Sequence, residues 1–190
     1  DANGGNLSLR LDGDRVLATP TTISKGFMQP DDLVILDLEG NQISGKRKST
    51  SEILMHLVIY RERPDFRSVA HAHPRYATAM ALAGRVLPQG LLPEVELLIG
   101  EIGLAPYRLP GSHEFAESLV PYIRRHSAIL LGNHGAVAMG RGLLEAYWKL
   151  EILESACAMY HLAEQMGGAH AIGPEGIEEI RSLRANFGLE

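Results

Sequence analysis

Two histidines stand two residues apart at the end of an apolar run, in the segment Ser68-Val69-Ala70-His71-Ala72-His73-Pro74. A short apolar run that is closed by a proline is typical of a buried β-strand. Because successive side chains on a strand point to opposite faces, His71 and His73 lie on one face. The segment therefore predicts a strand that presents half of a metal site. The alternative is a chance pair of histidines that has no function.

A third histidine follows another apolar run, in Ile129-Leu130-Leu131-Gly132-Asn133-His134-Gly135. The Asn-His-Gly segment predicts a tight turn at the end of a strand. Three histidines at strand ends can bind zinc and leave its fourth position open for a substrate. We therefore predict that His71, His73 and His134 bind Zn²⁺ or another divalent metal.

Composition limits the class of protein. The chain has 190 residues, of which 45% are hydrophobic, so one domain over residues 1–190 can form its own core. The single cysteine, Cys157, excludes an intramolecular disulfide and favours a reducing, cytoplasmic location. A net charge of -5 argues against nucleic acid as a partner, and no segment is long and apolar enough for a membrane span. The chain starts at Asp1 beside a glycine-rich turn, and we expect that a stretch precedes it.

Strand and helix signals are interleaved along the chain. Two hairpins are expected, one joining Leu7–Arg10 to Val16–Ala18 and one joining Leu33–Leu38 to Gln42-Ile43. Later strands are expected at 66–71, 104–107, 128–131 and 136–139, and helices at 52–63, 76–83, 112–125, 143–165 and 174–187. This order predicts an α/β or α+β fold, with a mixed or antiparallel sheet covered by helices.

Several polar and aromatic residues receive structural interpretations. Glu94 and Glu96 would share one face if their segment were a strand, and a solvated face is favoured over an approach to the metal. Cys157 is expected in the core, and Tyr147 and Trp148 are expected to pack rather than to bind a ligand. His56 falls on a helix and is assigned no function.

Glu52 is the best candidate for a general acid or base, because it stands beside Thr50-Ser51 at the start of a helix. Burial in a partly desolvated pocket would raise the pKa of this carboxyl toward neutrality. The alternative is a purely structural role, since Ser49 and Glu52 have the spacing of a capping box.

Three turns are candidates for binding an anion. Thr50 and Ser51 lie at a helix N-terminus, where backbone N–H groups favour phosphate, although simple capping explains them equally well. Gly4-Gly5-Asn6 and Thr19-Pro20-Thr21-Thr22 are also rich in small donors, with Lys25 just beyond. Together the three turns predict one phosphate site.

In their order and spacing, these residues resemble the class II aldolase/adducin family along nearly the whole chain. The similarity rests on Gly5-Asn6-Leu7-Ser8, Thr19-Pro20-Thr21, Thr50-Ser51-Glu52, His71-Ala72-His73, Ala105-Pro106-Tyr107 and Asn133-His134-Gly135. The resemblance implies a three-layer α/β/α domain around a central, mostly antiparallel sheet. It also implies a homotetramer with sites near subunit interfaces.

The resemblance further implies an aldehyde-lyase that uses zinc or a similar metal on His71, His73 and His134, with Glu52 as the acid/base. Its substrate would be a ketose phosphate resembling fuculose 1-phosphate. Reversible cleavage through a metal-stabilised enediolate would give dihydroxyacetone phosphate and an aldehyde. The residues that fall at the substrate phosphate are Asn6, Thr21, Thr22, Thr50 and Ser51.

The sequence departs from the family pattern at three places. Thr22 stands where the sugar-phosphate aldolases usually have glycine, Leu91-Leu92 replaces a tyrosine segment, and no tyrosine follows Tyr160. Decarboxylase, dehydratase and pentulose-phosphate epimerase chemistry therefore stay open, although the epimerases carry an aspartate where Glu52 stands. A non-catalytic adducin-like domain is the less favoured alternative, because such domains lack the intact metal histidines.

Overall fold

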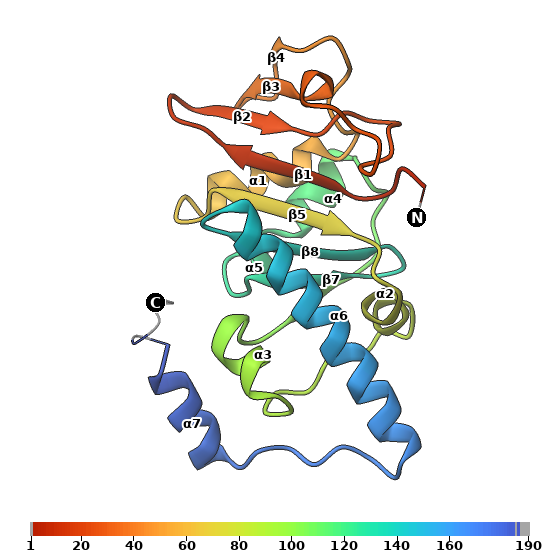
Figure 1. Ribbon diagram of the computed structural model, residues 1–190, viewed down its shortest axis with the longest axis vertical. Helices are drawn as coiled ribbons and strands as arrows, with labels where there is room; N and C mark the ends of the chain where they lie inside the picture. The colour runs from red at the N-terminus through yellow and green to blue at the C-terminus, as the bar shows by residue number, and fades with distance from the viewer. Residues whose placement is uncertain (1, 185, 187–190) are drawn as a thin grey trace.

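The computed structural model describes residues 2–184 and 186. Within these residues, eight strands form one sheet in the order β4-β3-β2-β1-β5-β8-β7-β6 (Figure 1). The strands are β1 (Asn6–Arg10), β2 (Arg15–Ala18), β3 (Val34–Asp37), β4 (Gln42–Ser44), β5 (Ser68–Ala72), β6 (Gly103–Ala105), β7 (Ala128–Leu131) and β8 (Gly135–Gly140). Among the described strands, β6 and β7 run parallel and all other neighbours run antiparallel. The sheet is therefore mostly antiparallel, as predicted.

Both predicted hairpins are present. In the first hairpin, Ser8 pairs with Ala18, and the turn contains Gly13 and Asp14 with φ values of 71° and 55°. These left-handed conformations suit glycine and aspartate, and they match the right-handed twist of the two strands.

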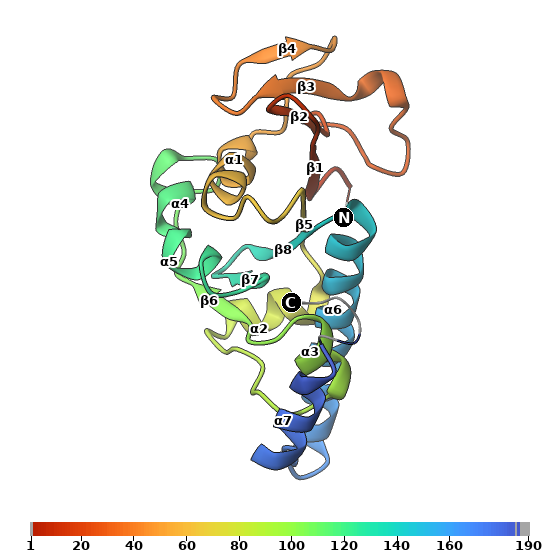
Figure 2. The ribbon, with the colours of Figure 1, turned by 90° about the vertical axis from the view of Figure 1, so that its left-hand side faces the viewer.

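Helices cover both faces of the sheet (Figure 2). The α-helices are α1 (Ile53–Glu62), α2 (Arg75–Leu82), α3 (Pro93–Leu98), α4 (His113–Ser118), α5 (Val120–Ile123), α6 (Leu143–Gln165) and α7 (Pro174–Ser182), with a short 3-10 helix at Pro30–Asp32. Alternating strand residues divide between two apolar cores. Val69 and Val137 pack with α1, α4 and α5, whereas Ala70 and Ala138 pack with α2, α3 and α6. This arrangement is the three-layer α/β/α fold.

Some local predictions were wrong. The segment with Glu94 and Glu96 is the helix α3, because Pro93 suits a first helical turn. Glu94 is exposed, but Glu96 is buried, accepts a hydrogen bond from Gly90 N and pairs with Arg181. The helix expected from Ser112 is divided at Leu119 into α4 and α5. Pro121 lies in the first turn of α5, which agrees with the irregularity that this proline predicts, and Ser112 caps α4 as predicted.

The long helix α6 has the predicted bounds, and its middle residues Leu153 and Cys157 are buried as expected. However, Tyr147 and Trp148 are 48% and 55% exposed, so the prediction that they pack inside this chain was wrong. The last helix, α7, ends at Ser182, and the predicted end at Phe187 lies outside the described residues. None of the helices within the described residues is long and apolar enough to cross a membrane.

Candidate metal centre and active site

The three histidines of the predicted metal site meet at one end of β5 and β8. His71 lies on β5, His73 follows it, and His134 lies in the turn between β7 and β8. Because β5 pairs with β8, with Ala72 opposite Ala136, this turn is placed beside His73. Gly135 permits the close approach, since a Cβ atom there would stand 2.5 Å from Ala72 O.

The imidazoles are close enough to share one metal ion. Each histidine offers a nitrogen, and these nitrogens lie within 4.8 Å of one another. His71 Nε2 and His73 Nε2 are 3.1 Å apart. His71 Nδ1 lies 2.9 Å from Ala136 O, which can only accept, so Nδ1 is assigned the proton. His71 Nε2 therefore presents its lone pair to the centre of the cluster, as in metal-binding histidines.

Glu52 completes this cluster from α1. Its Oε2 lies 3.2 Å from His71 Nε2, and its Oε1 lies 3.3 Å from His134 Nε2. Among the residues that the structure describes, Glu52 Oε1 is buried without a hydrogen-bond partner. A buried carboxylate and imidazole lone pairs that converge in this way are stabilised by a positive charge between them. The donor set fits a divalent cation such as Zn²⁺.

The charges of the cluster control the pKa of Glu52. Burial raises this pKa, but the hydrogen bond and charge of His71 when it is protonated, the hydrogen bond of Asn6 and the charge of His134 outweigh burial and lower it to about 2. The expectation of a raised pKa was therefore wrong. Burial and the charge of His71 lower the pKa of His134 to about 4, against the opposing charge of Glu52. Glu52 is thus held as a carboxylate beside His134, whose imidazole favours its neutral form.

A buried chain of hydrogen bonds supports Glu52 from behind. Asn6 Nδ2 donates to Glu52 Oε2 at 2.7 Å, and Asn6 Oδ1 lies 2.6 Å from His56 Nε2. His56 Nδ1 lies 2.6 Å from Ser8 Oγ, which lies 2.6 Å from Tyr60 Oη.

The acceptor at Asn6 Oδ1 assigns the His56 proton to Nε2, so Nδ1 accepts from Ser8 and Ser8 accepts from Tyr60. Every donor in this series of hydrogen bonds then points toward the carboxylate of Glu52. Burial lowers the pKa of His56 to about 3, so its imidazole is neutral. It acts as a bridge between β1 and α1.

Sequence reasoning missed this function of His56. His56 lies four residues after Glu52, so their side chains leave α1 on the same side. This spacing was the signal that could have linked the two residues. What the sequence did not reveal is that Asn6, from β1, would lie between them, and that Ser8 would contact the far side of the His56 ring.

The helix cap of α1 also differs from the prediction. Glu52 occupies the N-cap position itself, and its side chain makes no capping hydrogen bond there. Instead, Thr50 Oγ1 accepts from Glu52 N at 3.3 Å. The carboxylate is therefore directed to the histidines rather than used in a capping box with Ser49.

The structure brings the three predicted anion-binding turns together. Thr21 N donates to Lys48 O at 3.1 Å, and Thr50 N donates to Thr19 O at 3.0 Å. The amide of Asn6 contacts Glu52 and His56, and Thr50 is buried, whereas Thr22 and Ser51 are exposed.

Two further residues distinguish this region. Thr22 has φ 58°, a left-handed conformation that is strained for a β-branched residue and natural for glycine. Lys25 Nζ donates to Asn3 O at 2.6 Å. Burial lowers the pKa of Lys25, and the charge of Glu52 opposes this effect.

Comparison with known proteins defines the class. The sequence model of the Class II Aldolase and Adducin N-terminal domain matches residues 1–161, so the chain belongs to the class II aldolase/adducin family. The chain is 38% identical over 164 residues to an L-fuculose phosphate aldolase from Methanococcus maripaludis, and the match covers 86% of this chain and 88% of the relative.

Two more comparisons bear on chemistry and fold. A 3-oxo-tetronate 4-phosphate decarboxylase from Haemophilus influenzae is 36% identical over 160 residues, covering 82% of this chain and 76% of the relative. The solved structure of an L-fuculose 1-phosphate aldolase superimposes with a TM-score of 0.89 at 30% identity, covering 95% of this chain and 85% of that one. The resemblance found in the sequence and the predicted fold are both confirmed.

Proposed function

We propose that this chain is a divalent-metal-dependent aldolase that cleaves a ketose 1-phosphate, similar to fuculose 1-phosphate, reversibly to dihydroxyacetone phosphate and an aldehyde. The observation that carries the proposal is the buried Oε1 of Glu52, which faces three converging imidazoles. His71, His73 and His134 would hold the cation. When bound, a cation such as Zn²⁺ supplies Lewis-acid stabilisation of the negative charge that develops on substrate oxygens.

Glu52 is proposed as the proton carrier. Asn6 occupies Oε2, so Oε1 is the oxygen that faces the reaction. In the condensation direction, Glu52 takes a proton from the carbon of dihydroxyacetone phosphate that forms the new bond. In the cleavage direction it returns that proton to the same carbon. Glu52 is ionised before the first of these steps, so it can accept the proton.

The substrate phosphate is proposed to lie at the joined turns, against Asn6, Thr21, Thr22, Thr50 and Ser51. The exposed Thr22 and Ser51 can reach a ligand directly, whereas Thr50 and Asn6 shape the floor beneath it. Lys25 adds a positive charge near Glu52 and suits the same anion.

We also propose a homotetramer. The exposed aromatic side chains of Tyr147 and Trp148 on α6 support an interface, because large apolar side chains at a surface are typical of contact sites. Light scattering of the purified protein would test this assembly.

The first test is a product assay. Metal-loaded protein would be incubated with a panel of ketose 1-phosphates, and dihydroxyacetone phosphate would be followed with and without a chelator. Chelator-sensitive release of this triose is expected. Protein that is first treated with the ketose and borohydride, and then freed of both, should keep its activity because no Schiff base forms. Zinc-loaded protein that releases no triose from any of the ketoses would contradict the proposal.

The second candidate is a decarboxylase of a sugar-acid phosphate. It is favoured by the similarity to the 3-oxo-tetronate 4-phosphate decarboxylase. Release of carbon dioxide from a 3-oxo sugar-acid phosphate, without a triose phosphate, would identify this reaction. Dehydration or epimerisation would appear in the same assay as other products.

A further inference from the structure

The reaction proposed above includes a second proton transfer, which takes place on oxygen rather than on carbon. Condensation turns the oxygen of the aldehyde into a hydroxyl group, and cleavage removes the hydrogen from that hydroxyl group again. Glu52 exchanges the proton on carbon through Oε1, while Asn6 occupies its Oε2. A second acid/base group at the aldehyde oxygen would therefore speed the reaction.

A cavity of about 360 Å³ lies beside the metal centre, and its volume is typical of small-molecule sites. Among the described residues that line it, three have titratable side chains, namely Lys25, His71 and Tyr147. His71 donates from Nδ1 to Ala136 O and presents Nε2 to the centre of the cluster. The Tyr147 hydroxyl donates to Glu151, and this hydrogen bond raises the pKa of Tyr147. Lys25 is thus the side chain that is available for the substrate.

The backbone holds Lys25 beside the active site. Its turn follows β2 and is joined to the start of α1, because Thr50 N donates to Thr19 O at 3.0 Å. Lys25 Nζ donates to Asn3 O at 2.6 Å, which is the hydrogen bond that the described residues give this ammonium group. Its other hydrogens are therefore left for a ligand.

The charge of Lys25 acts on the metal centre. Burial lowers the pKa of Lys25, although the charge of Glu52 opposes this effect. Burial and the charge of His71 lower the pKa of His73, and the charge of Lys25 lowers it further. These effects place the ammonium group on the side of the centre that contains Glu52 and His73. A lysine whose pKa is lowered releases its proton more readily than a solvated lysine does, which suits acid/base chemistry.

We propose that Lys25 is a second catalytic residue, which donates a proton to the aldehyde oxygen during condensation and removes it during cleavage. This inference rests on the proposed aldolase function. In cleavage, the Lys25 amine takes the hydrogen of the substrate hydroxyl, and the electrons of the O–H bond form the carbonyl bond of the aldehyde. The electrons of the broken carbon–carbon bond stay on the triose until Glu52 returns a proton to its carbon. Lys25 then releases its proton to water and Glu52 takes one from water, so both groups regain their starting states.

Two reactions of the metal-loaded protein separate the function of Lys25 from that of Glu52. Exchange of deuterium from heavy water into dihydroxyacetone phosphate alone needs proton transfer at carbon. Cleavage of a ketose 1-phosphate needs proton transfer at carbon and at oxygen. Lys25→Arg keeps the positive charge, but arginine does not release its proton at neutral pH. We expect this variant to exchange deuterium as the wild type does, while kcat for cleavage falls roughly 100-fold or more with little change in KM.

Lys46→Arg is the matched control, because this exposed lysine does not line the cavity, and it should keep both reactions. A Lys25→Arg variant that cleaves the ketose as fast as the wild type would overturn the proposal. An equal loss of exchange and cleavage would also overturn it, because Lys25 would then act by binding the substrate anion that both reactions share. A wild type that releases no triose would instead overturn the aldolase function itself, so the two failures are distinguishable.

Discussion

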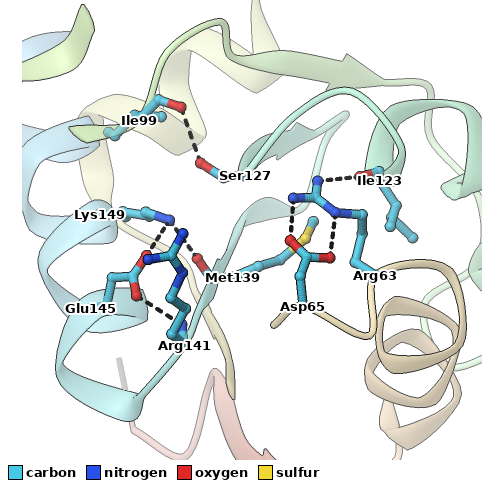
Figure 3. Close-up of polar contacts among 9 residues, drawn as sticks. All are labelled: Arg63, Asp65, Ile99, Ile123, Ser127, Met139, Arg141, Glu145 and Lys149. Carbon is cyan, nitrogen blue, oxygen red and sulfur yellow. Dashed lines mark hydrogen bonds and ion pairs between the residues drawn. The ribbon is translucent and has the colours of Figure 1, made fainter. Parts of the chain in front are cut away.

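The two ends of β5 and β8 place opposite charges in similar surroundings. At one end, His71, His134 and Glu52 direct lone pairs at one another, with nitrogen-to-oxygen distances of 3.2 and 3.3 Å. At the other end, Arg63 and Lys149 surround a small pocket with N–H donors. The first cluster can hold a cation, whereas the carboxylates of the second, Asp65 and Glu145, already accept from Arg63 and Lys149 (Figure 3). The comparison teaches that one sheet can separate unlike ionic sites by the length of a strand, because neighbouring strands start and end together.

The largest effect on metal binding and activity is expected when one of the three clustered histidines is removed. His134→Ala removes one of three ligands and should reduce bound zinc well below one equivalent and activity to background. Zinc content by mass spectrometry and the triose assay would measure both. The control His161→Ala changes an exposed histidine on α6 and should keep both properties. Stoichiometric zinc in His134→Ala would remove this residue from the site.

The next largest effect is expected at Glu52, where a substitution can remove acid/base chemistry while the histidines still bind the metal. Glu52→Gln keeps the size of the side chain but removes its negative charge, so zinc should stay bound while kcat falls roughly 100- to 10,000-fold. Glu101→Gln, an exposed glutamate, is the matched control. Full turnover in Glu52→Gln would show that another group moves the proton.

A smaller effect tests the supporting chain of hydrogen bonds. His56→Ala leaves Asn6 Oδ1 and Ser8 Oγ without their buried partner, and a lost partner of this kind costs about 1–3 kcal/mol in the free energy of unfolding. We also expect kcat to fall with little change in KM, because Asn6 no longer fixes Glu52. Urea unfolding and steady-state kinetics measure the two quantities. A His56→Ala variant as stable and as active as the wild type would show that these hydrogen bonds are dispensable.

The smallest effect is on the free energy of unfolding and is expected at Thr22, in the turn 19–22. Thr22→Gly should relieve the left-handed strain at φ 58° and raise the free energy of unfolding by about 1 kcal/mol. Thr21→Gly is the matched control. Thr21 does not have a positive φ, so glycine relieves no strain there and this variant should be less stable than the wild type. Equal changes in the two variants, measured by urea unfolding, would mean that the backbone conformation of Thr22 carries no strain.

Sequence reasoning predicted the parts that depend on local pattern. Strand alternation placed His71 and His73 on one face, and a long apolar stripe gave the bounds of α6. The short segment around Glu96 was harder, because six residues of α3 contain too little periodicity to tell a helix from a strand.

The remaining features depend on contacts between distant segments. His56 meets Asn6 across a separation of 50 residues, and the pocket beside Lys149 joins residues from 63 to 184. Neither set forms a recognisable motif along the chain. The pKa of Glu52 was predicted in the wrong direction for the same reason: local pattern indicates burial but does not give the number of donors and charges that burial brings close.

The chain of hydrogen bonds behind Glu52 has a stereochemical consequence. An asparagine amide cannot pass a proton onward, so Tyr60, Ser8 and His56 fix the carboxylate without supplying it with hydrogen. One oxygen, Oε1, is left to approach the substrate, and it does so from a single side. Turnover in heavy water should therefore place deuterium at only one of the two mirror-related hydrogen positions of the triose carbon. Because these positions give identical NMR signals, a second aldolase that exchanges only one of them would distinguish them.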